Sequence, residues 1–233
     1  MPRPPEYEEV SAGPDRGITL NDVDRVLYHA EFSSLMDGFG NGYVEREEDI
    51  YVLLRDGTAY HHAWDFPFTD LHVDVSRQRE PDRWFTWHED RGTLTLTQTG
   101  GPDAGEQVDV SDARRLMPAP QGYAPDHTYY YLDIGAGGGR SDREFAFSAD
   151  GTLRYSRSGF VAGNVGTSYI IAAGEDDDAV SVSDYAFDGY TLRINGPQGD
   201  ERHFAALIDG HDPDRPDEII IDGQVHWLRE DQQ

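Results

Sequence analysis

The stretch YVLLRDGT at residues 51–58 decides the fold, because it returns in the second half of the chain as FAFSADGT at residues 145–152. Each stretch is a short alternating run that ends in Asp-Gly-Thr. Glycine tolerates the positive φ that tight hairpin turns need, so this ending is a strong hairpin signal. Each copy therefore predicts two antiparallel strands joined by a turn.

Two more segments repeat in the same order. WHEDRGTLTL at residues 87–96 corresponds to YAFDGYTLRI at residues 185–194, and the glycine-rich residues 38–42 correspond to residues 135–139. The three offsets are 94, 98 and 97 residues, which agree to within four residues. Three elements in one order, at nearly one offset, predict an internal duplication.

The repeated strands predict an all-β protein made of two similar antiparallel β-meander halves. We expect the first half at residues 18–118 and the second at residues 119–229, joined near residues 118–125. Residues 1–17 hold four prolines and almost no apolar run, which predicts a flexible leader. Residues 230–233 are expected to be a frayed C-terminus.

Local patterns predict several individual elements. Residues 26–35 are expected to form a strand, residues 218–227 a hairpin around an Asp-Gly turn, and residues 75–84 a short helix with Ser76 as its cap. Large apolar side chains that share one face in each repeat form the predicted core: Tyr51, Leu53, Leu94, Leu96, Phe145, Phe147, Leu192 and Ile194.

The succession of strand, Asp-Gly-Thr turn, long arm and aromatic-x-x-Asp-Gly-x-Thr-Leu-x-Ile resembles the lipocalin-like (calycin-type) β-barrel and half-barrel families of bacteria, best over residues 143–227. The chain is also similar to a group of bacterial proteins that share the motif at residues 53–59 and a second element, matched here by Ser76, Arg77, Pro81 and Trp84. The resemblance implies either one large barrel or two packed lipocalin-like half-barrels, with room for a ligand.

Composition excludes several classes of function. Acidic residues outnumber basic ones 45 to 19, and the net charge of −26 repels phosphate backbones and anionic lipids. We therefore expect neither a nucleic-acid nor a membrane partner. The absence of cysteine excludes disulfides, thiol catalysis and cysteine-based zinc sites. No signal peptide is recognisable, so the expected location is cytoplasmic, or periplasmic or secreted if a signal peptide has been removed.

An aromatic-rich arm, residues 60–87, distinguishes the first half from the second. The corresponding residues 159–183 of the second half are rich in glycine, alanine and serine instead. The asymmetry suggests a cap over a pocket or a patch for a partner, although an arm that simply fills the end of a barrel fits the same pattern. The candidate ligand-binding side chains of this arm are Tyr60, His62, Trp64, Phe66, Trp84 and Trp87.

Four histidines, His61, His62, His72 and His88, fall within 28 residues. Histidine is a common metal ligand and general base, which makes a site of either kind one interpretation. Neighbouring strand residues point to opposite faces, however, so His61 and His62 cannot bind one ion from a regular strand. Surface or hydrogen-bonded histidines are the other interpretation. No metal or cofactor is expected, and no catalytic residue is assigned.

The leading expectation for the function is binding of a small apolar or cyclic molecule, with the arm as lid or rim. A barrel enzyme of the cyclase, isomerase or hydrolase kind is an alternative, and a non-catalytic interaction or structural module that meets a protein partner or a second copy is another. A filled interior favours the interaction module, and a cavity with only apolar walls favours ligand carriage. A cavity that holds His61, His62 or His72 beside an acid favours catalysis.

Overall fold

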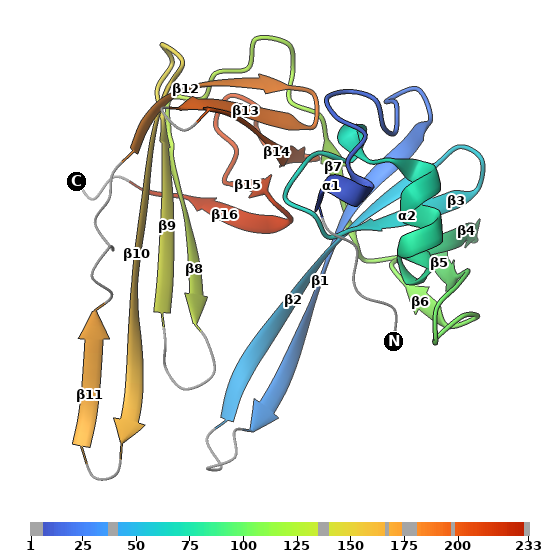
Figure 1. Ribbon diagram of the computed structural model, residues 1–233, viewed down its shortest axis with the longest axis horizontal. Helices are drawn as coiled ribbons and strands as arrows, with labels where there is room; N and C mark the ends of the chain where they lie inside the picture. Colours follow the sequence, from blue (N-terminus) through green and yellow to red (C-terminus); the bar gives the residue numbers. More distant parts are fainter. Residues whose placement is uncertain are drawn as a thin grey trace.

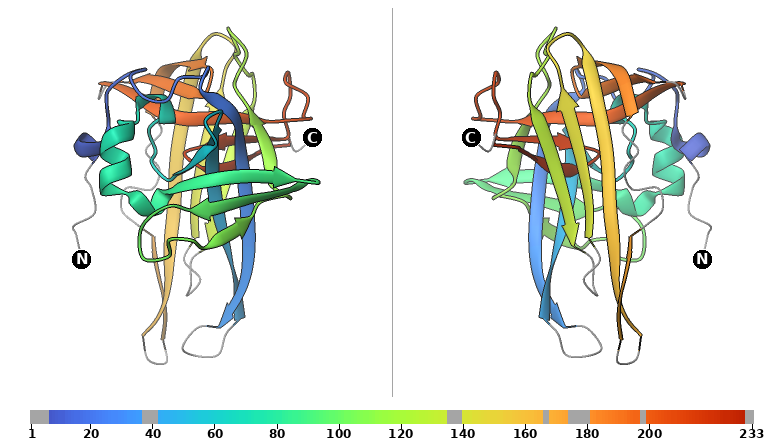
Figure 2. Two further views of the ribbon diagram at one scale, coloured as in Figure 1. Left: turned by 90° about the vertical axis from the view of Figure 1, so that its right-hand side faces the viewer. Right: turned by 90° about the vertical axis from the view of Figure 1, so that its left-hand side faces the viewer.

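The structure is a computed structural model that describes residues 7–36, 42–134, 140–165, 168–173, 181–196 and 199–230. The expected all-β class is confirmed. A closed barrel of eight antiparallel strands is extended by further strands of the same sheet (Figures 1 and 2). The glycine-rich residues 38–41 and 135–139 and the C-terminal residues 231–233 lie outside the described residues.

The closed barrel belongs to the second half of the chain. Neighbouring strands pair antiparallel, and the pairings of β16 with β8 and of β13 with β14 close the circuit. A ninth strand, β11 (Ser168–Ala173), pairs with β10 and lies off this circuit. The barrel strands are β8 (Thr128–Ile134), β9 (Arg140–Phe147), β10 (Thr152–Val165), β12 (Ser181–Asp188), β13 (Thr191–Gly196), β14 (Gly199–Ile208), β15 (Glu218–Ile221) and β16 (Gln224–Leu228).

The first half forms an open meander on the same sheet. Its last strand, β7, pairs with β1 on one side and with β14 on the other, and so joins the meander to the barrel. The arrangement is one barrel with an attached meander rather than two half-barrels of one kind (Figure 1). The strands are β1 (Val23–Met36), β2 (Gly42–Leu54), β3 (Thr58–His62), β4 (Trp84–Asp90), β5 (Thr93–Gln98), β6 (Gln107–Asp109) and β7 (Arg114–Met117).

Strand and hairpin predictions hold where local signals are strong. The predicted strand at residues 26–35 lies inside β1, and the predicted hairpin at residues 218–227 is formed by β15 and β16. Its turn residues Asp222 and Gly223 both have positive φ, of 51° and 80°. Two consecutive residues with positive φ are what a two-residue turn matching the strand twist requires.

The helix prediction needs one correction. Helix α2 spans Val73–Arg79 and is followed by the 3-10 turn η2 (Pro81–Arg83), so proline ends it as expected. Ser76 is not the cap, because the residue before the first turn is His72, which makes no side-chain capping bond. Ser76 lies inside the helix, where its hydroxyl donates to Glu80 at 2.9 Å.

Part of the predicted leader is packed against the arm. Val10, at the end of helix α1 (Tyr7–Val10), is fully buried, and Ser11 forms a β-bridge with Leu71. The adjoining 3-10 turn η1 (Phe68–Asp70) receives hydrogen bonds from Gly17 and Ile18. The amides of Ala12 and Gly17 donate to backbone carbonyls of the arm, so this part of the expected leader is held against the rest of the chain.

The two Asp-Gly-Thr hairpins have the same strand register. Leu53 pairs with Ala59 in the first hairpin, and Phe147 pairs with Leu153 in the second, 94 residues further on. In both turns the threonine amide donates to the aspartate side chain two residues earlier, at 2.9 Å and 3.0 Å. Short-range turn chemistry thus sets both registers in the same way.

The following hairpins also correspond. Trp87 pairs with Leu96, and Tyr185 pairs with Ile194, at the sequence offset of 98 residues. The backbone amides of Trp87 and Tyr185 each donate to the carbonyl oxygen of the turn glycine in the preceding Asp-Gly-Thr hairpin, at 3.0 Å and 2.8 Å. The two meanders therefore share their strand order and their pairing over these elements.

Three apolar clusters hold the fold together. One fills the barrel and contains Phe147, another covers the face of the first meander that looks away from the barrel and contains Leu53, and the third joins the two halves. Leu53 and Phe147 thus occupy corresponding places in their own meanders. Of the predicted core residues, Ile194 is partly buried, and the other seven are buried: Tyr51, Leu53, Leu94, Leu96, Phe145, Phe147 and Leu192.

Strands β14 and β15 are buried on both faces. The consecutive residues 204–208 of β14 are all buried, as are residues 219–221 of β15. Ile219 and Ile221 face the barrel interior, while Ile220 between them joins the cluster between the halves. This pattern follows from the alternation of side chains along a strand that has an apolar partner on each side.

The contact between residue 17 and the arm leaves no room for a side chain. A Cβ at Gly17 would lie 2.6 Å from the carbonyl oxygen of Leu71 and 2.8 Å from that of Phe68, both of them backbone atoms. We expect Gly17→Ala to lower the free energy of unfolding by about 3 kcal/mol, as overpacking against a rigid backbone does. Urea denaturation measures the change.

The matched control for this substitution is Gly13→Ala. Gly13 has φ of +86° and open space around it, so alanine there meets only the backbone preference, which costs about 1 kcal/mol. Equal losses in the two variants would contradict the proposed tight contact.

Candidate functional site

The aromatic arm packs between the two halves. Tyr60, His62, Phe66 and Trp84 are buried at 3% exposure or less in or beside the cluster that joins meander and barrel. Trp64 is partly buried and stacks on Phe66 at a centroid distance of 5.6 Å. The structure thus brings five of the six candidate residues together in one aromatic cluster.

Trp87, the sixth candidate, lies apart from the others. It packs against the cluster on the far face of the first meander, and its indole nitrogen donates to the carbonyl of Leu54 at 2.8 Å. None of the six side chains lines the barrel cavity or the outer hollow described below. Their role in ligand binding stays a prediction.

A hydrogen-bond network inside the arm connects two of its indoles with Ser76 and Glu80, whereas the hydroxyl of Tyr60 and both ring nitrogens of His62 are buried without a hydrogen-bond partner among the described residues. The indole nitrogen of Trp64 donates to Glu80 at 3.1 Å, and that of Trp84 donates to the hydroxyl of Ser76 at 3.1 Å. Glu80 also accepts from Ser76 and pairs with Arg83 at 3.2 Å. A buried carboxylate is tolerated here because several donors surround it. The indole donors are thus engaged within the arm.

His61 and His62 point to opposite faces of β3, as the alternation predicts. His61 pairs with Asp49 at 2.8 Å, whereas His62 lies among the rings of Tyr60, Phe66, Phe68 and Phe204. Burial lowers the pKa of His62 to about 3, so its ring is neutral. Among the residues that the structure describes, no group of three His, Asp or Glu side chains is arranged to hold a metal ion.

The barrel contains a cavity of about 410 Å³. It is lined by consecutive strands β9, β10, β12, β13 and β14 and by the turn between β15 and β16. Its apolar wall consists of Phe145, Leu153, Tyr155 and Ile194. A volume of this size and an apolar wall with a few polar groups are typical of small-molecule sites in proteins.

Aromatic packing fills the other part of the barrel. Phe147 contacts Tyr185 and Phe187 at centroid distances of 4.9 Å and 5.5 Å, and Tyr123 packs edge-on against Phe187 at 5.2 Å. Eight-stranded barrels are just wide enough for side chains to fill or for one small ligand to occupy. In this barrel, side chains fill one part of the interior and the cavity of about 410 Å³ lies in another part.

The hollow arises from small side chains on β12 and β13. Ser181 and Ser183 line it, and a Cβ at Gly196 would lie only 2.9 Å from the hydroxyl of Ser183. In the first meander, the position that corresponds to Ser183 at the offset of 98 residues is Phe85, which is buried in its own cluster. A ring therefore fills the first meander at the place where the barrel is hollow.

A group of charged side chains also lines the cavity. The ring nitrogen Nδ1 of His203 lies 2.9 Å from Asp222, and Nε2 lies 3.3 Å from Glu201. Arg143 brings a further cationic group, held by a hydrogen bond of 2.8 Å to Gln224 and by stacking on Tyr131.

Local structure explains how this group assembles. Glu201 and His203 are two residues apart on β14 and therefore share the inward face. Asp222 is the first residue of the two-residue turn between β15 and β16, where its left-handed backbone aims the side chain back toward β14. Antiparallel pairing of β14 with β15 brings the two segments together across 19 residues of sequence.

The ionisation of His203 and Asp222 follows from their surroundings. Burial disfavours the charged form of His203, but hydrogen bonds and charge from Asp222 and Glu201 outweigh it and raise the pKa of His203 to about 9. Burial also raises the pKa of Asp222, against the opposing effect of His203. His203 is therefore an imidazolium ion at neutral pH, with both N–H groups directed at carboxylates.

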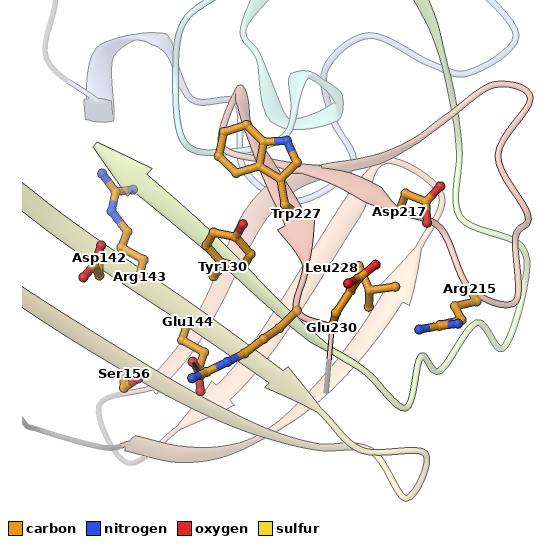
Figure 3. A pocket seen from close by; sticks show the side chains of 11 residues that line it. Tyr130, Asp142, Arg143, Glu144, Ser156, Arg215, Asp217, Trp227, Leu228 and Glu230 are labelled. Atoms are coloured by element: carbon orange, nitrogen blue, oxygen red, sulfur yellow. Dashed lines mark hydrogen bonds and ion pairs between the residues drawn. The ribbon is translucent and has the colours of Figure 1, made fainter. Parts of the chain in front are cut away.

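A larger hollow of about 940 Å³ lies on the outer side of β8, β9 and β16 (Figure 3). Seven of its eleven lining side chains are charged, and Arg229 and Glu144 within it form an ion pair with each other. Tyr130, Trp227 and Leu228 are among its lining side chains (Figure 3). A wide hollow with these features is well suited to water, and the barrel cavity with its apolar wall is the better candidate for a ligand.

The fold and the cavity identify this chain as a β-barrel protein with an internal cavity. No protein-family model, no curated protein and no solved structure matches the chain. None of the helices in the described part of the chain has the length and apolar character needed to cross a membrane.

Proposed function

We propose that this protein binds a small apolar or cyclic molecule in the cavity of its barrel. The observation that carries the proposal is the hollow beside Ser183, where the corresponding position of the first meander holds Phe85. A protein interior is normally packed to the density of an organic crystal, so the apolar wall of this cavity lacks packing contacts that a bound ligand can supply.

The lipocalin-like class and the duplication belong to this proposal. Matching registers in the two meanders support a common ancestral unit, and the closed barrel with an interior site supports a lipocalin-like way of binding. In this scheme the aromatic arm lies outside the barrel and supports the site indirectly. Its His62 packs on Phe204, which is the neighbour of His203 on β14. The proposed partner is the small molecule, and the proposed location is the cytoplasm.

The test is to fill the cavity. Titration with N-phenyl-1-naphthylamine, a neutral dye that fluoresces in apolar surroundings, is expected to show saturable binding of one dye per protein. Ser183→Phe places in the barrel the ring that Phe85 supplies in the first meander, and we expect it to weaken dye binding at least about tenfold. Val182→Phe is the control, because Val182 is the exposed neighbour on the same strand.

Two outcomes contradict the proposal. One is the absence of saturable dye binding to the unaltered protein. The other is unchanged affinity in a Ser183→Phe variant whose circular dichroism spectrum and melting temperature show a native fold. If Ser183→Phe does not fold, Ser181→Trp at the rim of the same cavity takes its place.

Catalysis in the same cavity is the second candidate function, favoured by the contact between His203 and Asp222. An imidazolium ion held by a carboxylate can donate a proton to a bound substrate, as a barrel cyclase, isomerase or hydrolase requires. Turnover of a bound ligand that is lost in His203→Gln, while binding persists, would support the enzyme over the carrier.

A further inference from the structure

We infer that the barrel cavity selects an amphipathic anion: a small apolar ring or chain carrying one acid group, which takes the place of Glu201 against the ring of His203. This inference rests on the proposed function and names the class of its ligand. It is carried by the unequal contacts of His203 and by the charges around the cavity.

The two carboxylates that contact His203 are not equivalent. Asp222 is fixed in a two-residue turn, lies 2.9 Å from Nδ1, and keeps 24% of its side chain exposed. Glu201 lies 3.3 Å from Nε2, and 56% of its side chain is exposed. Glu201 therefore holds its position weakly, since an exposed ion pair contributes little free energy, and its long side chain is free to turn into solvent.

When Glu201 turns into solvent, the position that it leaves beside Nε2 of His203 suits an acid group of a ligand. Nε2–H of His203 would then need an acceptor, and a charge-assisted bond to an anionic oxygen is stronger than one to a neutral group. With Glu201 turned away, the cavity side holds the cations His203 and Arg143 against the single carboxylate of Asp222. An anion balances this charge, whereas an amine would face two cations.

The apolar wall provides the other half of the selectivity. Phe145, Leu153 and Ile194 line the same cavity as His203, so a ligand there meets both apolar side chains and the imidazolium. Against the effect of burial, Asp222, which keeps its contact with Nδ1, raises the pKa of His203 and so favours that charge at neutral pH. A chain of net charge −26 otherwise repels anions, so preference for an acid must come from the site itself.

Two dyes with the same ring skeleton test the inference. N-phenyl-1-naphthylamine is neutral, and 1-anilinonaphthalene-8-sulfonate carries one acid group. We expect His203→Gln to weaken binding of the sulfonate at least about tenfold more than it weakens binding of the neutral dye. We expect Glu201→Gln to tighten binding of the sulfonate about threefold or more, because the competing carboxylate is gone.

His88→Gln is the matched control, because His88 is exposed on β4 of the first meander. It should change neither affinity. If His203→Gln leaves the affinity for the sulfonate unchanged, or weakens both dyes equally, the inference is overturned while the binding function stands. If neither dye binds the unaltered protein, the proposed function itself fails. Circular dichroism and melting temperature establish that each variant is folded.

Discussion

Lowering the pH from about 7 to about 5 is expected to remove about 4 kcal/mol of the free energy of unfolding through two buried histidines, His62 and His226. Burial lowers their pKa values to about 3 and about 4, whereas both titrate near 6.5 in an unfolded chain. The unfolded state therefore binds more protons below pH 6.5, and the stability falls as the pH falls toward the folded values.

The two rings have no room for compensating charge. His226 is 1% exposed and packs against Tyr131 and Phe145, and its Nδ1 lies 3.0 Å from the carbonyl of Gln224. His62 is 3% exposed among aromatic rings. His203 contributes in the opposite sense, since its raised pKa gives stability that is complete below pH 6.5 and is lost as the pH rises toward 9.

The double variant His62→Met/His226→Met isolates this effect from the titration of surface carboxylates. Methionine fills irregular space and has no proton to bind. Urea denaturation at a series of pH values is expected to show that the variant loses about 4 kcal/mol less than the unaltered protein between pH 7 and pH 5. Parallel curves for the two proteins would show that the buried rings do not control acid stability. His88→Gln serves as the exposed control.

Replacing Arg202 with Met is expected to lower the free energy of unfolding by about 4 kcal/mol, because it leaves a buried carboxylate without its partner. Arg202 of β14 binds Asp70 of the arm through Nε at 2.7 Å and Nη2 at 2.9 Å, and Nη2 also reaches Asp15 at 2.7 Å. Asp70 is 3% exposed. One guanidinium thus ties the N-terminal segment, the arm and the barrel together.

The neighbouring Arg193→Met provides the contrast. Arg193 pairs with Asp188 and Asp15, but 47% of its side chain is exposed, so its loss should cost no more than about 1 kcal/mol. The double variant Arg202→Met/Asp70→Asn should recover part of the loss, since asparagine carries no charge and still accepts from the amide of Asp15. Urea midpoints that fall equally for Arg202→Met and Arg193→Met would contradict this account.

Much of the fold was predictable because the signals for it are local. An Asp-Gly-Thr or Asp-Gly turn needs only its own residues to fix a hairpin, and alternation then assigns the faces of the adjoining strands. The closure of the barrel was not predictable in this way. It depends on pairing between β8 and β16, which are about ninety residues apart in sequence, and no local pattern specifies that contact.

The candidate site was largely missed for the same reason. His61 and His62 are neighbours in the sequence, but strand geometry points them to opposite faces. His203 and Asp222, in contrast, come into contact only through the tertiary fold. A signal was present in the sequence: Glu201 and His203 alternate on one strand, and Asp222 opens an Asp-Gly turn. The error at Ser76 has a related cause, because its hydroxyl is used by Trp84 and Glu80 rather than by the start of the helix.

Because β14 and β15 are buried on both faces, the barrel and the first meander depend on each other for stability. These strands present apolar side chains to the barrel interior on one face and to the cluster between the halves on the other. Removing either the barrel or the first meander would therefore leave isoleucine and phenylalanine side chains facing water. Although the two halves share the pairing of several strands, we expect that neither folds without the other. The repeat in the sequence has become a single cooperative body.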